Sequence, residues 1–247
     1  MTLDNPSINP NDSYSLGRRI FRKLVHFFSY HFIIDRNRTA FTEVAGLRLK
    51  VGPGVFHPKI FLTSKFFAEF LQRQDFRGRS VVEVGTGSGI LALSAAKAGA
   101  VSVLALDINP QAVATASANA ELNGLPQVEA RHSNLFSAVG ENEKFDVVLS
   151  SPPSFGGEPK SMADRAWHAG PGYRDILPLF DQAARRLKPG GAMYLLISSD
   201  SNAALFDHLI EKAGFVATRI ATQSIVIEEF YLYELRQRTA ATAMAAE

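Results

Sequence analysis

The feature that most constrains the fold is a short stretch in which an apolar, β-branched run ends in a cluster of glycines and leads directly into a helix-forming run. Residues 81–84 form the apolar run, Gly85, Gly87 and Gly89 form the cluster, and residues 91–98 follow. This order predicts a strand, a tight turn and a helix. Glycine lets the main chain turn sharply and lets a ligand come close to it. The N–H groups at the start of a helix can bind a polar group.

The spacing of these glycines separates the turn from a dinucleotide-binding one. The dinucleotide fingerprint is G-x-G-x-x-G, with an acidic residue about 20 positions later. Here the spacing is one residue tighter, and Glu83 precedes the first glycine. An acid at that place repels a pyrophosphate and attracts a ligand with an ammonium or sulfonium centre. Asp107 ends the next apolar run and is well placed for both hydroxyls of a ribose. The stretch therefore predicts a nucleoside-type ligand, and a nicotinamide oxidoreductase is only a weak candidate.

From residue 79 onward, strand-like and helix-like segments alternate. The predicted strands are 79–84, 101–106, 127–132, 145–149 and 192–198, and the predicted helices are 89–98, 110–123, 173–187 and 202–213. Pro189-Gly190-Gly191 is expected to stop the third helix, and the last strands, 215–222 and 225–235, are joined by a tight turn and hence antiparallel. This predicts an α/β, Rossmann-like, doubly wound, seven-stranded sheet, mostly parallel with an antiparallel last strand. Ligands of such sheets bind at the C-terminal ends of the strands.

Two motifs resemble a known family. The glycine stretch 83–89 with Asp107 resembles the nucleoside-binding motifs of class I S-adenosylmethionine-dependent methyltransferases. The segment Ser151-Pro152-Pro153-Ser154, after the strand 145–149, resembles their strand-four motif. Members that methylate planar nitrogens read Asn/Asp/Ser-Pro-Pro-aromatic there. Residues 54–58 and 165–175 resemble the HemK-like glutamine methyltransferases, a small-domain subgroup. The resemblance covers roughly residues 46–235.

The resemblance implies S-adenosyl-L-methionine as cofactor and a set of residues that bind it. These residues are Glu83, Gly85, Thr86, Gly87, Gly89, Asp107, Ile108, Asn134 and Ser151. Asp107 is expected to bind the ribose hydroxyls, Glu83 the amino group, and Asn134 the adenine amine. Two alternatives stay open, because Asn134 could be a turn residue and Asp107 could cap the helix that starts at Pro110.

The resemblance also implies how the methyl acceptor is held. Ser151 and the carbonyl of Pro152 would accept both N–H groups of a planar nitrogen, so that the catalytic segment is Ser151, Pro152, Pro153 and Ser154. Ser154 occupies the place of the stacking aromatic but cannot stack. Phe155 is a candidate substitute, and Phe56, Phe155, Trp167 and His168 are the expected substrate contacts, with Arg165 as a further candidate. By the same resemblance, Phe56 and Thr63 are candidate contacts on the cofactor side. The long polar loop 155–172 is predicted to be a lid or substrate loop, and no metal site is expected.

The expected function is S-adenosylmethionine-dependent methyl transfer, directed to nitrogen, with a protein glutamine, a nucleic-acid base or a small-molecule amine or amide as acceptor. Two alternatives are open. One is a methyltransferase-like subunit that binds the cofactor without catalysis, to which Ser154 gives some weight. The other is a small-molecule methyltransferase of a biosynthetic pathway. The acceptor class and any need for a partner protein are left open.

The chain is expected to have three parts: an N-terminal extension (1–55), the domain that resembles the methyltransferases (56–237) and a tail (238–247). Within the extension we expect a disordered start, a basic amphipathic helix over 15–34 and a β-hairpin over 41–51. Residues 1–79 carry 13 Lys and Arg against 6 Asp and Glu, which is consistent with an anionic partner or with a solvated basic face. The helix could instead pack on the core or on a second copy of the chain, or lie on a membrane surface.

The remaining composition bears on location. The chain has no cysteine, which excludes disulfides, thiolate metal sites and a cysteine nucleophile. Its first residues lack the pattern of a signal peptide, and no run of apolar residues is long enough to predict a membrane span. We therefore expect a cytoplasmic protein.

Overall fold

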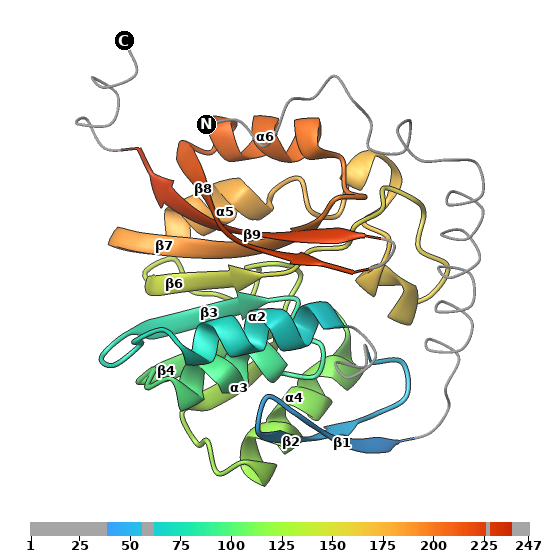
Figure 1. Ribbon diagram of the computed structural model, residues 1–247, viewed down its shortest axis with the longest axis vertical. Helices are drawn as coiled ribbons and strands as arrows, with labels where there is room; N and C mark the ends of the chain where they lie inside the picture. The colour runs from blue at the N-terminus through green and yellow to red at the C-terminus, as the bar shows by residue number, and fades with distance from the viewer. Residues whose placement is uncertain (1–38, 56–61, 226–227, 239–247) are drawn as a thin grey trace.

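The computed structural model describes residues 39–55, 62–225 and 228–238. Its main sheet has seven strands in the order β5-β4-β3-β6-β7-β9-β8 (Figure 1). The strands are β3 (Ser80–Val84), β4 (Ser102–Asp107), β5 (Val128–His132), β6 (Phe145–Ser150), β7 (Leu187–Ser198), β8 (Phe215–Ser224) and β9 (Glu229–Gln237). The helices are α2 (Leu62–Gln72), α3 (Ile90–Lys97), α4 (Pro110–Leu122), α5 (Leu179–Arg186) and α6 (Ala203–Lys212), with short 3-10 helices at Ala163–Ala166 and Pro171–Tyr173.

The sheet is parallel from β5 through β7, and only β9 runs antiparallel to its neighbours, β7 and β8. From β3 the chain first adds β4 and β5 on one side and then β6 and β7 on the other. The strand order therefore reverses between β3 and β6, and in an open α/β sheet ligands bind outside the carboxyl ends of the strands at such a point. The predicted doubly wound α/β fold is confirmed.

Alternate residues of the strands bury opposite faces of the sheet. Val81 and Val147 pack in one apolar cluster with α2, α3 and α4. Val82 and Val148, their neighbours along each strand, pack in a second cluster with α5 and α6. Because strand side chains point to alternate faces, runs of consecutive apolar residues are what a sheet covered on both sides requires. Figure 1 shows the two groups of helices on either side of the strands.

A two-stranded hairpin, β1 (Ala40–Val44) and β2 (Leu47–Val51), lies against α4. Asn119 accepts the main-chain N–H of Lys50 at 2.7 Å and donates to its carbonyl at 3.0 Å, as a neighbouring strand would do. The hairpin predicted for residues 41–51 is thus present. The proposed helix at 15–34, the start of the chain and residues 239–247 lie outside the described residues, and the domain boundaries stay a prediction.

Two segments differ from the sequence-based expectation. The α-helix expected over 173–187 begins only at Leu179. Tyr173 ends a short 3-10 helix with a positive φ of 60°, which lies outside the α-helical region, so an α-helix cannot start there. The expected break at Pro189-Gly190-Gly191 lies within the continuous strand β7. There the pairing register with β6 shifts between Phe145 and Val147, and such irregularities accommodate proline and glycine in a sheet.

None of the helices in residues 39–55, 62–225 and 228–238 combines the length and the apolar character that a membrane span needs.

Candidate active site

A cavity of about 420 Å³ opens at the carboxyl ends of β3, β4, β6 and β7, beside the start of β9. Its size falls within the range of small-molecule sites, which is roughly 300–1,000 Å³. The residues that line it come from the glycine loop, from the ends of these strands and from the loop that follows β6. The cavity therefore lies where the strand order reverses.

The glycine loop presents its main chain to this cavity. The N–H groups of Gly85 and Thr86 both donate to the carbonyl of Leu106 at 2.9 Å, which fixes the loop against the end of β4. Gly85 has a φ of +83° and lines the cavity, and a Cβ atom added to it would meet no other atom within 4 Å. The main chain at Gly85 thus faces open space, and the loop fits a ligand that approaches the backbone closely.

The Glu83 side chain holds the glycine loop in place through buried hydrogen bonds. The residue is only 1% exposed. Its Oε2 atom accepts hydrogen bonds from the Thr86 hydroxyl at 2.6 Å and from the N–H of Ala92 at 2.9 Å. Burial raises the pKa of Glu83 to about 8, although both hydrogen bonds oppose the shift. The side chain therefore joins the glycine loop to α3 as a mostly neutral acid at pH 7, and it also lines the cavity.

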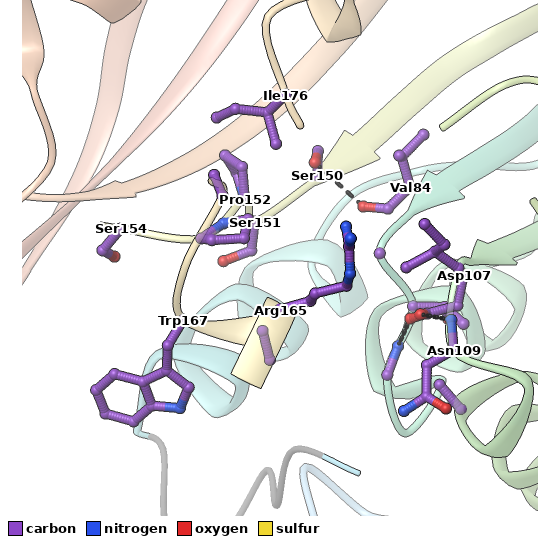
Figure 2. Close-up of a pocket in the computed structure, with 18 of the residues that line it drawn as sticks. Val84, Asp107, Asn109, Ser150, Ser151, Pro152, Ser154, Arg165, Trp167 and Ile176 are labelled. Carbon is purple, nitrogen blue, oxygen red and sulfur yellow. Dashed lines mark hydrogen bonds between the residues drawn. The ribbon is translucent and has the colours of Figure 1, made fainter. Parts of the chain in front are cut away.

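Asp107 ends β4 and faces the same space (Figure 2). Its Oδ2 atom accepts the N–H of Gly87 and its Oδ1 atom that of Asn109, each at 2.8 Å. Asn109, not Asp107, caps α4, because its side chain accepts the N–H of Gln111. Burial raises the pKa of Asp107. Each carboxylate oxygen can accept a further hydrogen bond, so Asp107 can still bind hydroxyl groups.

Asn134 follows β5 and lines the cavity beside Ser133 and Leu135. Its main chain belongs to a turn, since its N–H donates to the Ser137 hydroxyl at 3.0 Å and its carbonyl accepts the N–H of Ser137. The turn role and the binding role considered for Asn134 are thus compatible, because the turn uses the main chain.

The Ser-Pro-Pro-Ser segment is fixed at both ends. Before it, the Ser150 hydroxyl donates to the carbonyl of Val84 at 3.1 Å and joins the end of β6 to the end of β3. Behind it, the Tyr173 hydroxyl donates to the Ser154 carbonyl at 2.6 Å. Ser151, Pro152, Pro153 and Ser154 all line the cavity. The segment thus lies between the glycine loop and the loop 155–172.

Phe155 stacks on Trp167, with 6.2 Å between ring centroids and 8° between ring planes. Main-chain hydrogen bonds support this contact, from Phe155 to the Trp167 carbonyl and from Ala169 to the Phe155 carbonyl. Both rings line the cavity, as does His168. In Figure 2 the Trp167 indole points away from Ser151 and Asp107. The stack therefore forms an aromatic wall of the cavity.

An ion pair and a histidine–carboxylate hydrogen bond order the loop 155–172. Arg165 pairs with Asp175 at 2.8 Å, and both line the cavity. The Nδ1 atom of His168 lies 2.7 Å from Oδ1 of the fully buried Asp164, whose other oxygen accepts the N–H of Lys160. Figure 2 shows the Arg165 side chain directed toward the side of the cavity where Val84 and Asp107 lie.

Comparison with known proteins identifies the family. The family model described as "Methyltransferase small domain" matches residues 46–227. The chain belongs to the methyltransferase small domain family. Membership confirms the expected class, S-adenosylmethionine-dependent methyltransferases, and with it the expected enzyme and its cofactor.

Individual relatives agree with the family. A putative protein N5-glutamine methyltransferase of Methanocaldococcus jannaschii is 31% identical over 76% of this chain and 94% of its own length. A release factor glutamine methyltransferase of Aliivibrio fischeri is 25% identical over 71% of this chain and 65% of its own. The 16S rRNA N2 G1207 methyltransferase of T. thermophilus, solved with AdoMet and guanosine, has a TM-score of 0.62 at 25% identity, covering 81% of this chain and 50% of that one. These methyltransferases give no support to a non-catalytic subunit.

The structure brings most of the predicted site residues of this methyltransferase to one cavity. The cavity is lined by the expected Glu83, Gly85, Thr86, Gly87, Asp107, Ile108, Asn134, Ser151, Pro152, Pro153, Ser154, Phe155, Trp167 and His168, and by Thr63 and Arg165. Gly89 does not line it. Gly89 precedes α3 with a φ of +85°, and a Cβ atom there would lie 3.0 Å from that of Ala116, so its small size allows close packing against α4. Phe56 lies outside the described residues.

Four site residues escaped the sequence analysis: Asp164, Tyr173, Asp175 and Glu228. The only signal for them is position, since all lie in the loop after β6 or in the turn before β9. In the part of the chain that the structure describes, no cluster of three His, Cys, Asp or Glu side chains is arranged to hold a metal ion.

Proposed function

We propose that this methyltransferase methylates a planar amide nitrogen of a protein side chain. The observation that carries the proposal is the position of Ser151-Pro152-Pro153, which lines the same cavity as the glycine loop and Asp107 on one side and the Phe155–Trp167 stack on the other. A methyl donor and a planar acceptor could therefore meet at this segment.

The cofactor side is proposed to work through Asp107, the glycine loop and Asn134. Bound S-adenosylmethionine supplies an electrophilic methyl group on a sulfonium centre. Asp107 would accept hydrogen bonds from the ribose hydroxyls, and the open main chain at Gly85 would lie against the methionine part. Asp107 also brings negative charge near a cationic ligand, which favours binding in a site of low dielectric.

The acceptor side is proposed to work through two oxygen atoms. The Ser151 hydroxyl and the Pro152 carbonyl would accept the two N–H groups of the amide, which orients the nitrogen toward the methyl group. Phe155 takes the stacking role that Ser154 cannot fill, since its ring lines the cavity. Holding the two reactants aligned removes much of the entropic part of the barrier. The chain's own contribution is thus mainly orientation.

An amide is favoured because two curated relatives are named as glutamine methyltransferases. The exocyclic amine of a nucleic-acid base is the second candidate, because the structural neighbour solved with guanosine shares the fold over 81% of this chain. The cytoplasmic location and the anionic partner or self-association expected for the N-terminal extension stay predictions.

Transfer of labelled methyl from S-adenosylmethionine into fractionated cell extract tests the proposal, with Asp107→Ala and Ser151→Ala as variants. We expect label in protein, at an amide nitrogen identified by mass spectrometry. Both variants should reduce it, but only Asp107→Ala should weaken binding of S-adenosylhomocysteine. Label in nucleic acid would favour the second candidate. No label in any fraction, with cofactor binding intact, would overturn methyl transfer to these acceptors.

A further inference from the structure

Arg165 is the only lysine or arginine among the described residues that line the cavity. It comes from the loop after β6, which also carries the Phe155–Trp167 stack. In Figure 2, however, its side chain points away from Trp167, toward the side where Val84 and Asp107 lie. Val84 ends β3, and the glycine loop follows it directly. Arg165 therefore places a positive charge on the glycine-loop side of the cavity.

The main chain that carries Arg165 is held by a buried carboxylate. Arg165 lies in the 3-10 helix Ala163–Ala166, directly after Asp164, which is fully buried. One oxygen of Asp164 accepts the N–H of Lys160, and the other lies 2.7 Å from Nδ1 of His168. These contacts join residues before and after Arg165, so its guanidinium group extends from a fixed part of the loop.

Asp175 orients the guanidinium group of Arg165 without using all of its donors. The Nη1 atom of Arg165 donates to Oδ2 of Asp175 at 2.8 Å. The other oxygen, Oδ1, accepts a hydrogen bond from Nε of Arg174 at 3.0 Å, so a single carboxylate is shared between two guanidinium groups. A guanidinium group has five N–H donors in a planar arrangement that fits a carboxylate. Arg165 can therefore hold Asp175 and bind a second carboxylate at the same time.

The glycine loop uses main-chain N–H groups for its own structure. Those of Gly85 and Thr86 donate to the Leu106 carbonyl, and that of Gly87 donates to Asp107. These donors are thus not directed at a ligand, although the main chain at Gly85 is open to the cavity. An anionic group beside the loop needs a different partner, and Arg165 is the cationic side chain that points there.

The cofactor of this family carries such an anionic group. S-adenosylmethionine and S-adenosylhomocysteine both end in an amino acid whose α-carboxylate is negatively charged. With the ribose at Asp107 and the amino-acid part at Gly85, this carboxylate would lie on the side to which Arg165 points. Glu83 does not repel it, because burial raises the pKa of Glu83 to about 8 and leaves the side chain mostly neutral at pH 7.

We infer that Arg165, oriented by Asp175, binds the α-carboxylate of the cofactor, and that the loop 155–172 is therefore part of the cofactor site. The inference rests on the cofactor position of the proposed function and is independent of the methyl acceptor. Because Phe155 and Trp167 lie on the same loop, binding of the carboxylate also steadies the aromatic wall proposed for the acceptor. The loop thus connects occupancy of the donor site with the shape of the acceptor site.

Two ligands test this inference: S-adenosylhomocysteine and its decarboxylated analogue, which lacks only the α-carboxylate. Their dissociation constants are measured by calorimetry on the full chain. We expect the wild type to bind S-adenosylhomocysteine about 10-fold tighter than the analogue, as for hydrogen bonds to a charged group. Arg165→Gln should reduce this preference about 5-fold and change the dissociation constant of the analogue by less than about 3-fold. Arg165→Lys keeps the charge but not the planar fork, and should keep part of the preference.

Arg174→Gln is the matched control, because it removes the same charge from the other guanidinium group bound to Asp175. Arg174 also pairs with Glu158 and does not line the cavity. This variant should keep the wild-type preference, and thermal unfolding reports whether each variant folds.

Three results would overturn the inference: no preference in the wild type, the same preference in Arg165→Gln as in the wild type, or an equal loss in Arg174→Gln. Each of them leaves the proposed methyl transfer standing, because the analogue and S-adenosylhomocysteine still bind. No binding of either ligand to the wild type would overturn the proposed cofactor position as well. The titration involves no methyl transfer, so it and the labelling experiment can fail separately.

Discussion

The Tyr173 hydroxyl donates a hydrogen bond to the carbonyl of Ser154, with 2.6 Å between the two oxygen atoms. The same hydroxyl accepts the N–H of Asn202, the residue that caps α6, at 3.1 Å. Burial raises the pKa of Tyr173, so the hydroxyl stays protonated and remains a donor at neutral pH. The end of the Ser-Pro-Pro-Ser segment is therefore tied to the start of α6 through one buried phenol.

Tyr173→Phe removes this tie without changing the size of the ring. We predict that kcat for methyl transfer falls about 10-fold, equivalent to roughly 1.4 kcal/mol, because Ser151 and Pro152 are less firmly placed. The dissociation constant of S-adenosylhomocysteine should stay within 2-fold. Tyr194→Phe is the control, since Tyr194 is equally buried but bonds Glu234 away from the cavity. Equal kcat values for the two variants would contradict the positioning role.

Glu83 should make the stability of the protein depend on pH. Burial raises its pKa to about 8 in the folded state, against 4.5 for an exposed glutamate. Between these values the folded state holds a proton that the unfolded state has lost, so stability falls as pH rises from about 5 to 8. Glu83→Gln removes this contribution and keeps an oxygen for Thr86 and Ala92. Urea unfolding at about pH 5 and pH 8 measures the free energy of unfolding. Its decline between the two pH values should be at least ~1 kcal/mol smaller in the variant than in the wild type. If the free energy of unfolding falls equally in the wild type and in the variant, the raised pKa of Glu83 is ruled out.

Alanine substitutions at two glycines should show that one contacts the cofactor and that the other allows two helices to pack closely. Gly85 and Gly89 both have positive φ angles, so alanine at either position costs about 1 kcal/mol of backbone strain. At Gly85 the new methyl group enters the cavity, and we predict at least 10-fold weaker binding of S-adenosylhomocysteine. At Gly89 it meets Ala116 at 3.0 Å, and we predict a larger loss of stability than at Gly85. Calorimetry and urea unfolding measure the two effects, and the reverse pattern would refute this division of roles.

Phe155→Leu tests the aromatic wall. Removing the stack on Trp167 should raise the KM for the methyl acceptor about 2- to 10-fold, the range expected for an aromatic contact of 0.5–1.5 kcal/mol. Cofactor binding should not change. The control is Phe41→Leu, because Phe41 is 75% exposed on the hairpin. If both variants keep the wild-type KM, Phe155 does not contact the acceptor.

The parts of the site that could be predicted from sequence are those encoded in short stretches. Gly85, Asp107 and Ser151 each follow a strand that its own apolar run identifies, and parallel strands bring their carboxyl ends to one edge. Tyr173 could not be found in this way, because its partner Ser154 is 19 positions away and its positive φ lies inside a helix-like pattern. Glu228 could not be found either, since Ser198 lies 30 positions before it and the contact depends on how β9 pairs with β7.

Gly89 was predicted to bind the cofactor, but it does not line the cavity. A glycine in the right place in a motif was expected at the ligand, but the structure places it between α3 and α4. Spacing alone does not show which side of a turn each glycine faces. That distinction depends on the path of α4, which packs against the turn from a later part of the chain.

The antiparallel course of β9 separates the two halves of the cavity along the chain. The half proposed to bind the nucleoside is built by residues 83–135, and the half proposed to bind the acceptor includes Ile225 and Glu228, which flank the connection between β8 and β9. A change in the length or sequence of that turn would reshape one wall without moving the strands that carry Asp107 and the glycine loop. In a scaffold of this kind, acceptor choice can diverge through a single hairpin connection while the methyl-donor site stays the same.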